Sequence, residues 1–184
     1  MYLYTHSMLH RAFDATAPHL DEGLVLEFGV YFGKTIRMIA ARFPQVTVHG
    51  FDTFSGLPED WHLEGQGAYS TAGLLPPAPL NVRYHVGLFS ETLPGFAQET
   101  KAPIRFMNID CDLYSSTRSI FDVLAERVVA GTVMVFDEYL MTPHWQEDEF
   151  AAFQEVVADR GWEYEYLGIS LVSKQAIVRI TAVK

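Results

Sequence analysis

The stretch LVLEFGVYFGKTIRMIAARF, from residue 24 to residue 43, contains both kinds of segment on which the fold depends. Its first part, LVLEF, is short and apolar, which is typical of a strand covered on both faces. Its second part has apolar residues at helical spacing, namely Ile36, Ile39, Ala40 and Phe43. Gly29 and Gly33 lie between the two parts, where they let the backbone turn tightly. The stretch therefore predicts a strand, a tight turn and a helix.

The same alternation continues along the chain. Short apolar runs predict strands over residues 46–51, 82–86, 104–109 and 132–136. Helical spacing recurs in residues 115–128, with Ser115 or Ser116 as the N-cap, and in residues 146–160. Two closing strands, over 162–169 and 175–183, have only a short link, so one of them should run antiparallel. The pattern predicts an α/β fold with three layers, αβα, around a mainly parallel seven-stranded sheet that contains one antiparallel strand.

Two further segments frame this core. The first 20 residues are expected to form a helix that packs on the sheet edge or over the site. Residues 57–80 contain four prolines and several glycines, which predicts a long loop with a functional or mobile role. No composition shift marks a linker, so residues 1–184 are interpreted as a single domain.

Composition excludes several classes of protein. The formal net charge of −10 argues against a protein that grips nucleic-acid phosphates, so no nucleic-acid partner is expected. Cys111 is the only cysteine, which excludes an intramolecular disulfide and multi-cysteine zinc sites. The sequence shows neither a signal peptide nor an apolar run that could span a membrane, so a cytoplasmic location without a membrane partner is expected.

The glycine turn and the end of the next strand suggest a nucleotide-like cofactor. In EFGVYFGKT the glycines are four residues apart, so the turn is not the dinucleotide pattern GxGxxG. Glu27, two residues before Gly29, instead resembles the pattern of S-adenosylmethionine (SAM) binders, with a generic strand-to-helix turn as the alternative. Asp52 ends the second strand 23 residues beyond Gly29, where such proteins place an acid on the ribose, although it could also cap a turn. The other candidate cofactor-binding residues are Gly33, Thr35, Thr53, Phe54, Ser55, Gly87, Phe89 and Asp110.

Carboxylates follow two of the predicted strands. FMNIDCDLY brings Asp110 to the end of the fourth strand, and VMVFDEY brings Asp137 and Glu138 to the end of the fifth. If these strands are neighbours, the three carboxylates meet at one edge and repel one another unless a cation joins them. Oxygen ligands suit Mg²⁺ or another divalent cation. The alternative is that some of these acids cap helices, as Asp112 could do.

Together these segments resemble the macrocin O-methyltransferase family, SAM-dependent enzymes that methylate sugar hydroxyls on macrolides, and the related methyltransferases of cephalosporin biosynthesis. The resemblance covers about residues 25–153 and rests on LEFGVYFGKT, GFDTFSGLPEDW, GLFSETLP, NIDCDLYSST and GTVMVFDEY, in that order. It implies a Rossmann-like class I SAM methyltransferase fold, metal ligands at Asp110, Asp137 and Glu138, a ribose-binding acid at Asp52, and a homodimer. The chain departs from the family in having Glu138 where two successive aspartates are common, and in a shorter N-terminal part.

The predicted function is therefore a SAM-dependent, Mg²⁺-dependent O-methyltransferase that acts on a small-molecule hydroxyl, in a sugar or another natural product. Asp110 would bind the metal and accept the proton, with His144 as the alternative base. Two other classes stay open: a nicotinamide-dependent oxidoreductase, and a non-catalytic protein with the SAM-binding fold. Transfer to nitrogen or carbon instead of oxygen also stays open.

Overall fold

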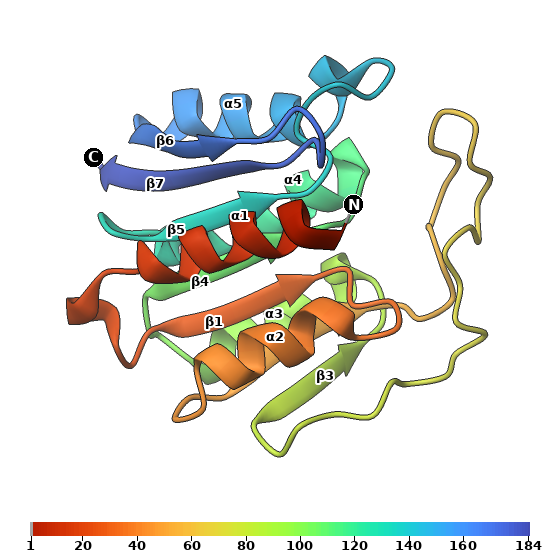
Figure 1. Ribbon diagram of the computed structural model, residues 1–184, viewed down its shortest axis with the longest axis horizontal. Coiled ribbons are helices and arrows are strands. Elements are labelled where there is room, and N and C mark those ends of the chain that lie inside the picture. Colours follow the sequence, from red (N-terminus) through yellow and green to blue (C-terminus); the bar gives the residue numbers. More distant parts are fainter. Residues whose placement is uncertain (1) are drawn as a thin grey trace.

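A seven-stranded sheet forms the centre of the computed structural model, which describes residues 2–184 (Figure 1). The strands are β1 (Leu24–Phe28), β2 (Val48–Asp52), β3 (Val82–Val86), β4 (Ile104–Ile109), β5 (Val133–Phe136), β6 (Glu163–Ile169) and β7 (Ala176–Ala182). The helices are α1 (Tyr2–Asp14), α2 (Lys34–Arg42), α3 (Phe89–Glu99), α4 (Tyr114–Leu124) and α5 (Glu149–Arg160). No helix in residues 2–184 is long and apolar enough to cross a membrane.

The topology confirms the predicted sheet. The strand order is β3-β2-β1-β4-β5-β7-β6, and every pair from β3 to β5 is parallel. Strand β7 runs antiparallel to both of its neighbours, β5 and β6. It is therefore the one antiparallel strand. Because β1, β2, β4 and β5 are parallel, the turns that follow them all reach the same edge of the sheet.

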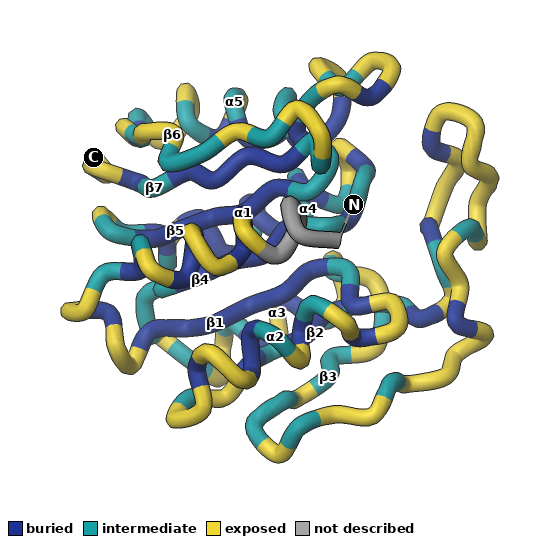
Figure 2. Tube along the Cα trace, viewed as in Figure 1, coloured by how far each residue is buried: buried dark blue, intermediate teal, exposed yellow. Residues whose placement is uncertain are grey.

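Two apolar cores hold the three layers together, and the buried strands separate them (Figure 2). Helices α3, α4 and α5 pack on one face through side chains such as Phe96, Phe121 and Phe153. Helices α1 and α2 pack on the other face through Phe13, Ile36 and their neighbours. Helix α1 contacts β5 and β6, so it lies across the face of the sheet and not at its edge.

Several element boundaries differ from the sequence-based expectation for local reasons. Strand β2 begins at Val48 instead of residue 46, because the Asn81 side chain donates hydrogen bonds to the carbonyls of Ala40, Phe43 and Val46. Helix α4 begins after Leu113 without a side-chain cap, so the expected serine cap is wrong; Ser115 Oγ instead donates to Glu59 Oε1 at 2.5 Å. Helix α5 begins at Glu149 instead of residue 146 and ends at Arg160, and Gly161 stops it, as predicted, with a left-handed φ of +61°.

The long connection between β2 and β3, residues 53–81, forms no helix or strand and extends beyond the sheet edge (Figure 1). It contains one isolated bridge, between Trp61 and Glu64. Leu57 and Trp61 pack against Leu113, which anchors the loop to the turn that precedes α4. The predicted long loop is therefore present, and it is attached to the rest of the domain at Leu113, just before α4.

A half-buried histidine pair joins β2 to β3, and it predicts a loss of stability in mild acid. His49 Nδ1 lies 3.0 Å from His85 Nε2, and burial lowers the pKa of His49 from 6.5 to about 4. As the pH falls from 6.5 to 4 the unfolded chain takes up this proton first, so folding weakens. We expect a loss of about 1–2 kcal/mol after solvent screening of the half-buried ring.

Urea unfolding of the wild-type protein and of His49→Phe across this pH range measures the effect. The comparison isolates the imidazole, because carboxylates with raised pKa values titrate in the same range with the opposite sign. A wild-type curve that runs parallel to the variant's curve from pH 7 to pH 4 contradicts the prediction.

Candidate active site

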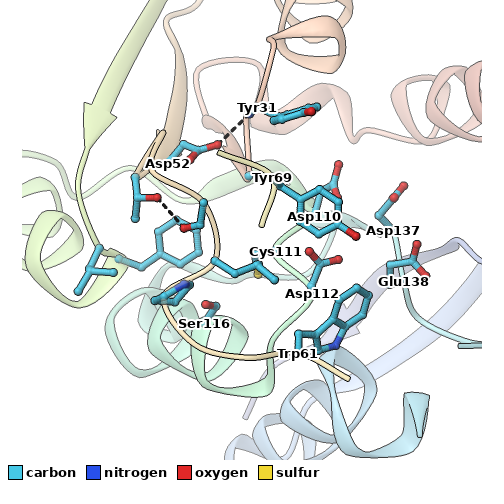
Figure 3. Close-up of a pocket in the computed structure, with 17 residues that line it drawn as sticks. Tyr31, Asp52, Trp61, Tyr69, Asp110, Cys111, Asp112, Ser116, Asp137 and Glu138 are labelled. Carbon is cyan, nitrogen blue, oxygen red and sulfur yellow. Dashed lines mark hydrogen bonds between the residues drawn. The ribbon is translucent and has the colours of Figure 1, made fainter. Parts of the chain in front are cut away.

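A cavity of about 270 Å³ opens at the edge of the sheet where β1, β2, β4 and β5 end (Figure 3). Open α/β sheets bind their ligands at this edge. The polar and glycine residues of its lining are Gly29, Asp52, Thr53, Gly56, Asp110, Asp112, Ser116, Asp137 and Glu138. The remaining lining residues are Tyr31, Leu57, Pro58, Trp61, Tyr69, Leu88, Phe89 and Cys111.

The turn after β1 can exist only with glycine at its first position. Gly29 has a φ of +87°, and a Cβ atom there would lie 1.7 Å from the carbonyl oxygen of Asp110. Gly33 has a φ of +71° and forms the N-cap of α2. The first glycine thus lets the β1 turn approach the end of β4 closely, and the second lets the helix start. Both glycines of the predicted turn thus have a positive φ, which favours glycine at these positions.

Asp52 organises the backbone around this turn. Its Oδ2 accepts hydrogen bonds from the amides of Val30 (2.7 Å) and Tyr31 (2.8 Å), and its Oδ1 accepts one from Phe54 (2.6 Å). A carboxylate has about four acceptor positions, so roughly one is left for a ligand hydroxyl. Asp52 therefore stabilises the turns, as one interpretation of the sequence predicted, and it also lines the cavity, as a ribose-binding acid would have to.

Four carboxylates gather on one side of the cavity (Figure 3). Burial, followed by the charges of Asp137 and Asp112, raises the pKa of Asp110 well above its ordinary value. Burial, together with the charges of Glu138 and Asp137, raises the pKa of Asp112 to about 7. Burial also raises the pKa of Asp137 to about 6, although a hydrogen bond from Gln175 opposes that shift. The group is under mutual repulsion, which a cation would relieve.

The chemistry of this group fits a hard divalent cation, because every donor is an oxygen. In the described part of the chain, however, no three His, Cys, Asp or Glu side chains already converge as a metal site. Asp137 accepts a hydrogen bond from Gln175, and Glu138 Oε2 lies 3.2 Å from Lys174 Nζ. These contacts engage Asp137 Oδ1 and Glu138 Oε2, so the other oxygen of each carboxylate is the one that stays available to a cation.

Glu149, at the start of α5, holds the turn that carries Asp110 and Asp112. Its Oε1 accepts hydrogen bonds from the backbone amides of Cys111 and Asp112, both at 3.2 Å. The side chain is fully buried, and its Oε2 has no hydrogen-bond partner. Asp112 takes a left-handed φ of +64° in this turn, a conformation that a non-glycine residue adopts only when its surroundings enforce it. The fixed turn directs the Asp112 side chain into the cavity (Figure 3).

The long loop provides a largely apolar part of the cavity lining, beside the carboxylates (Figure 3). Leu57, Trp61 and Tyr69 from this loop line the cavity. His62, which follows Trp61, contacts the buried Asp148: the distance from His62 Nε2 to Asp148 Oδ2 is 2.7 Å. The neighbouring residues Asp148 and Glu149 therefore hold the loop on one side and the carboxylate turn on the other.

Some residues predicted for the site lie elsewhere. Glu27 is fully buried and accepts a hydrogen bond from Asn108 Nδ2 at 3.2 Å, and its Oε2 has no partner. It does not line the main cavity, although Asn108 and Thr35 line a small second cavity of about 30 Å³. His144 lies outside both linings, with 67% of its side chain exposed and its Nδ1 3.4 Å from Glu147.

Of the other predicted cofactor-binding residues, some line the main cavity and some do not. Thr53 and Phe89 line the main cavity, whereas Phe54 is buried against Tyr84 and Ser55 is exposed. Gly87, with a φ of +141°, donates its amide to the Asp52 carbonyl at 3.1 Å. Sequence reasoning did not assign Tyr31, Tyr69 or Glu149 to the site. Of these three, only Tyr31 could have been assigned to the site from the sequence, because it lies between Gly29 and Gly33 in the glycine turn.

The comparisons with known proteins agree on the type of domain. The family described as "Methyltransferase domain" matches residues 26–139, which is more than half of the chain. These residues run from β1 to the acids that follow β5. The match therefore contains the glycine turn and all four carboxylates. No curated protein sequence matches the chain.

Solved structures share the fold at low sequence identity. The calicheamicin methyltransferase CalS11 superposes with a TM-score of 0.69 at 20% identity, covering 96% of this chain and 77% of that chain. The O-methyltransferase NovP gives a TM-score of 0.69 at 22% identity, covering 95% and 78%. A putative caffeoyl-CoA O-methyltransferase from Staphylococcus aureus gives 0.61 at 12% identity, covering 99% and 85%.

Proposed function

This chain belongs to the methyltransferase domain family and is a SAM-dependent methyltransferase, and we propose that it methylates a hydroxyl oxygen of a small molecule with the help of Mg²⁺ or another divalent cation. The observation that carries the proposal is the cavity itself. It joins the glycine turn and Asp52, which suit a nucleoside, to a group of carboxylates and an apolar wall, which suit an acceptor. The printed descriptions of NovP and of the Staphylococcus aureus protein as O-methyltransferases also support the choice of oxygen.

SAM would supply the reactive methyl group, so the chain's own residues have to position it. The remaining acceptor position of Asp52 suits a ribose hydroxyl. Leu88 and Phe89 suit the adenine because they are apolar residues of the same lining and follow Gly87, whose amide donates to the Asp52 carbonyl. The unpartnered Glu27 Oε2, buried behind the glycine turn, is the acceptor that a methionine ammonium would need. We propose that the backbone turn at Gly29 lies against the methionine part.

Asp110, Asp137 and Glu138 are the residues that would hold the cation. Such an ion lowers the pKa of an acceptor hydroxyl and orients its oxygen. The proton then needs a base that faces the same cavity, and both Asp110 and Asp112 do so. We favour these two over His144, which is exposed and paired with Glu147. The acceptor is proposed to be a sugar or a related natural product with neighbouring hydroxyls, as the resemblance to macrocin O-methyltransferases implies.

Calorimetry with SAM, followed by methyl transfer from labelled SAM to a panel of glycosides and catechols, tests the proposal. We expect SAM to bind with and without Mg²⁺, and methyl transfer to fall at least about 100-fold when EDTA removes the cation. Full activity in EDTA would remove the cation from the mechanism. Labelled product only on amines or carbon acids would remove the assignment to oxygen.

A further inference from the structure

We propose that His62 and Asp148 are positioning residues for the methyl acceptor. Their contact holds the long loop, residues 53–81, so that Trp61 stays beside the carboxylates, and it supports the binding of the acceptor but not the binding of SAM. The inference rests on the proposed function in assigning this part of the cavity to the acceptor. It comes from the way in which the start of α5 is joined to the loop.

Asp148 is the N-cap residue of α5, yet its side chain does not cap the helix. An aspartate in this position usually accepts a hydrogen bond from an amide of the first helical turn. Here its Oδ2 instead accepts a hydrogen bond of 2.7 Å from His62 Nε2, and only 10% of the side chain is exposed. Because a buried carboxylate is costly without a partner, the contact with His62 is what stabilises Asp148 in this position.

His62 lies in a tight turn that does not itself favour histidine. Trp61 and Glu64 exchange two backbone hydrogen bonds of 2.8 Å, so only His62 and Leu63 connect them. His62 has a φ of +50° there, a conformation that glycine adopts most easily. Leu63 is fully exposed, whereas the side chain of His62 turns inward to Asp148. The side chain of His62, and not its backbone preference, therefore explains a histidine at this position.

Two neighbouring rings keep the imidazole of His62 in place. Its ring centroid lies 5.1 Å from that of Trp61 and 5.8 Å from that of His144, and the two histidine rings are stacked with an interplanar angle of 24°. His144 thus supports the contact from outside the cavity. Because Trp61 lines the cavity, the orientation of His62 directly affects the shape of the lining.

The loop has few other side-chain attachments near this turn. Leu57 and Trp61 form a small cluster with Leu113, separate from the two main cores, and Glu59 accepts a hydrogen bond of 2.5 Å from Ser115 Oγ. Both contacts join the loop to the start of α4, whereas the His62 contact joins it to the start of α5. Segments with few buried apolar contacts open at a small cost in free energy. Loss of the His62 contact should therefore release the turn that carries Trp61.

Trp61 lies on the carboxylate side of the cavity and not on the side proposed for the ribose. It packs against Leu113, which follows Asp112 in the chain, and Figure 3 shows it near Asp112 and Glu138, with Asp52 at the other end. Asp52 is held by backbone amides that lie outside the turn around His62. Release of this turn should therefore weaken acceptor binding and leave SAM binding unchanged.

Hydrogen exchange of matched variants tests whether the pair holds the loop. His62→Phe keeps a ring but loses the N–H that Asp148 accepts, His62→Gln keeps an N–H donor, and Leu63→Ala is the control in the same turn. We expect the hydrogen-bonded amides of Trp61 and Glu64 to exchange about tenfold faster or more in His62→Phe. In the other two variants these amides should stay within about threefold of the wild-type rate.

Steady-state methyl transfer from labelled SAM to catechol and to methyl α-glucoside tests the role in acceptor binding. In His62→Phe the KM for the acceptor should rise about tenfold or more, while kcat falls by no more than about threefold. The Kd of SAM, measured by calorimetry, should change by less than about twofold, and His62→Gln should restore the KM. The double variant His62→Phe/Asp148→Leu should show the KM of His62→Phe alone, because the two residues act through one contact.

Wild-type exchange rates in His62→Phe, no rescue by His62→Gln, or a loss of SAM affinity as large as the rise in KM overturns the inference. A wild-type KM in a folded and active His62→Phe also overturns it, and leaves the proposed function intact. No methyl transfer by the wild-type protein to either compound counts instead against the proposed function, and with it against the acceptor role. The exchange rates then still decide whether the pair holds the loop.

Discussion

Asp110→Asn is expected to reduce methyl transfer by about 100- to 10,000-fold while making the folded protein more stable. Asparagine has the same shape but removes the charge that a cation and a proton require. Asp110 also sits among like charges, and burial raises its pKa well above the ordinary value, so its ionised form weakens folding at neutral pH. A loss of activity together with a gain in stability is expected where buried like charges serve function at the expense of folding stability.

The gain in stability has a defined pH dependence. Above the raised pKa the wild-type folded state carries the unfavourable charge, so the difference between variant and wild type should be largest near pH 8. It should shrink toward pH 4, where the wild-type carboxyl becomes protonated in both states. Urea unfolding at the two pH values and a methyl-transfer assay measure both effects.

Asp122→Asn is the matched control for this substitution. Asp122 lies on the exposed side of α4, where it contacts Arg118 at 3.0 Å, and surface pairs of this kind contribute about 0–1 kcal/mol. The control should retain activity and show only a small change in stability. Undiminished methyl transfer in Asp110→Asn would remove this carboxylate from the chemistry.

Gly29→Ala is expected to destabilise the fold by about 2–5 kcal/mol and to abolish SAM binding. The added Cβ would lie 1.7 Å from the carbonyl oxygen of Asp110 and 2.8 Å from its carbonyl carbon. Both contacts are with backbone, so no side-chain rotation can relieve them. The turn after β1 or the end of β4 must move, and each movement displaces Asp110 and the amides that Asp52 holds.

Gly73→Ala separates this clash from the cost of the backbone conformation alone. Gly73 has a similar φ, +76°, but nothing lies within 4 Å of the position that a Cβ atom would occupy. Its replacement should therefore cost about 1–2 kcal/mol, from the left-handed conformation only. Urea unfolding of both variants and calorimetry with SAM measure the difference. Equal loss of stability in the two variants would show that the close approach at Gly29 is unimportant.

Local patterns in the sequence predicted the sheet and the helices α1, α2, α4 and α5, but not α3. Each central strand is a short, mainly apolar run that ends in or is followed by a glycine or an acid, and helices α2 and α4 have a stripe of apolar residues at helical spacing, so burial on both sides of the sheet follows from the pattern itself. The short link between the two closing strands indicated that one of them is antiparallel, and the structure shows that it is β7. The boundary errors arose where a distant side chain intervened, as Asn81 does at the start of β2.

The acids at the strand ends could also be located from the sequence, because neighbouring parallel strands bring their carboxyl ends to one edge. What each acid does there could not be read in this way. Glu149 looks like an ordinary acid at a helix start, yet it is fully buried and binds the amides of a turn that lies far away in the sequence. His144 looked well placed on the rim, but the chain turns it outward to solvent.

The pattern of residues thus specified the strands, most of the helices and the order of the motifs, since these depend on interactions between residues close together in the chain. The edge at which ligands bind followed from the general rule that parallel strands share one carboxyl edge. The orientation of Asp112, the apolar wall formed by Trp61 and Tyr69, and the absence of basic side chains from the lining in residues 2–184 emerged only from the folded arrangement. The physical reason is that a side chain's direction is set by packing and hydrogen bonds between segments far apart in sequence, and a one-dimensional pattern does not contain those contacts.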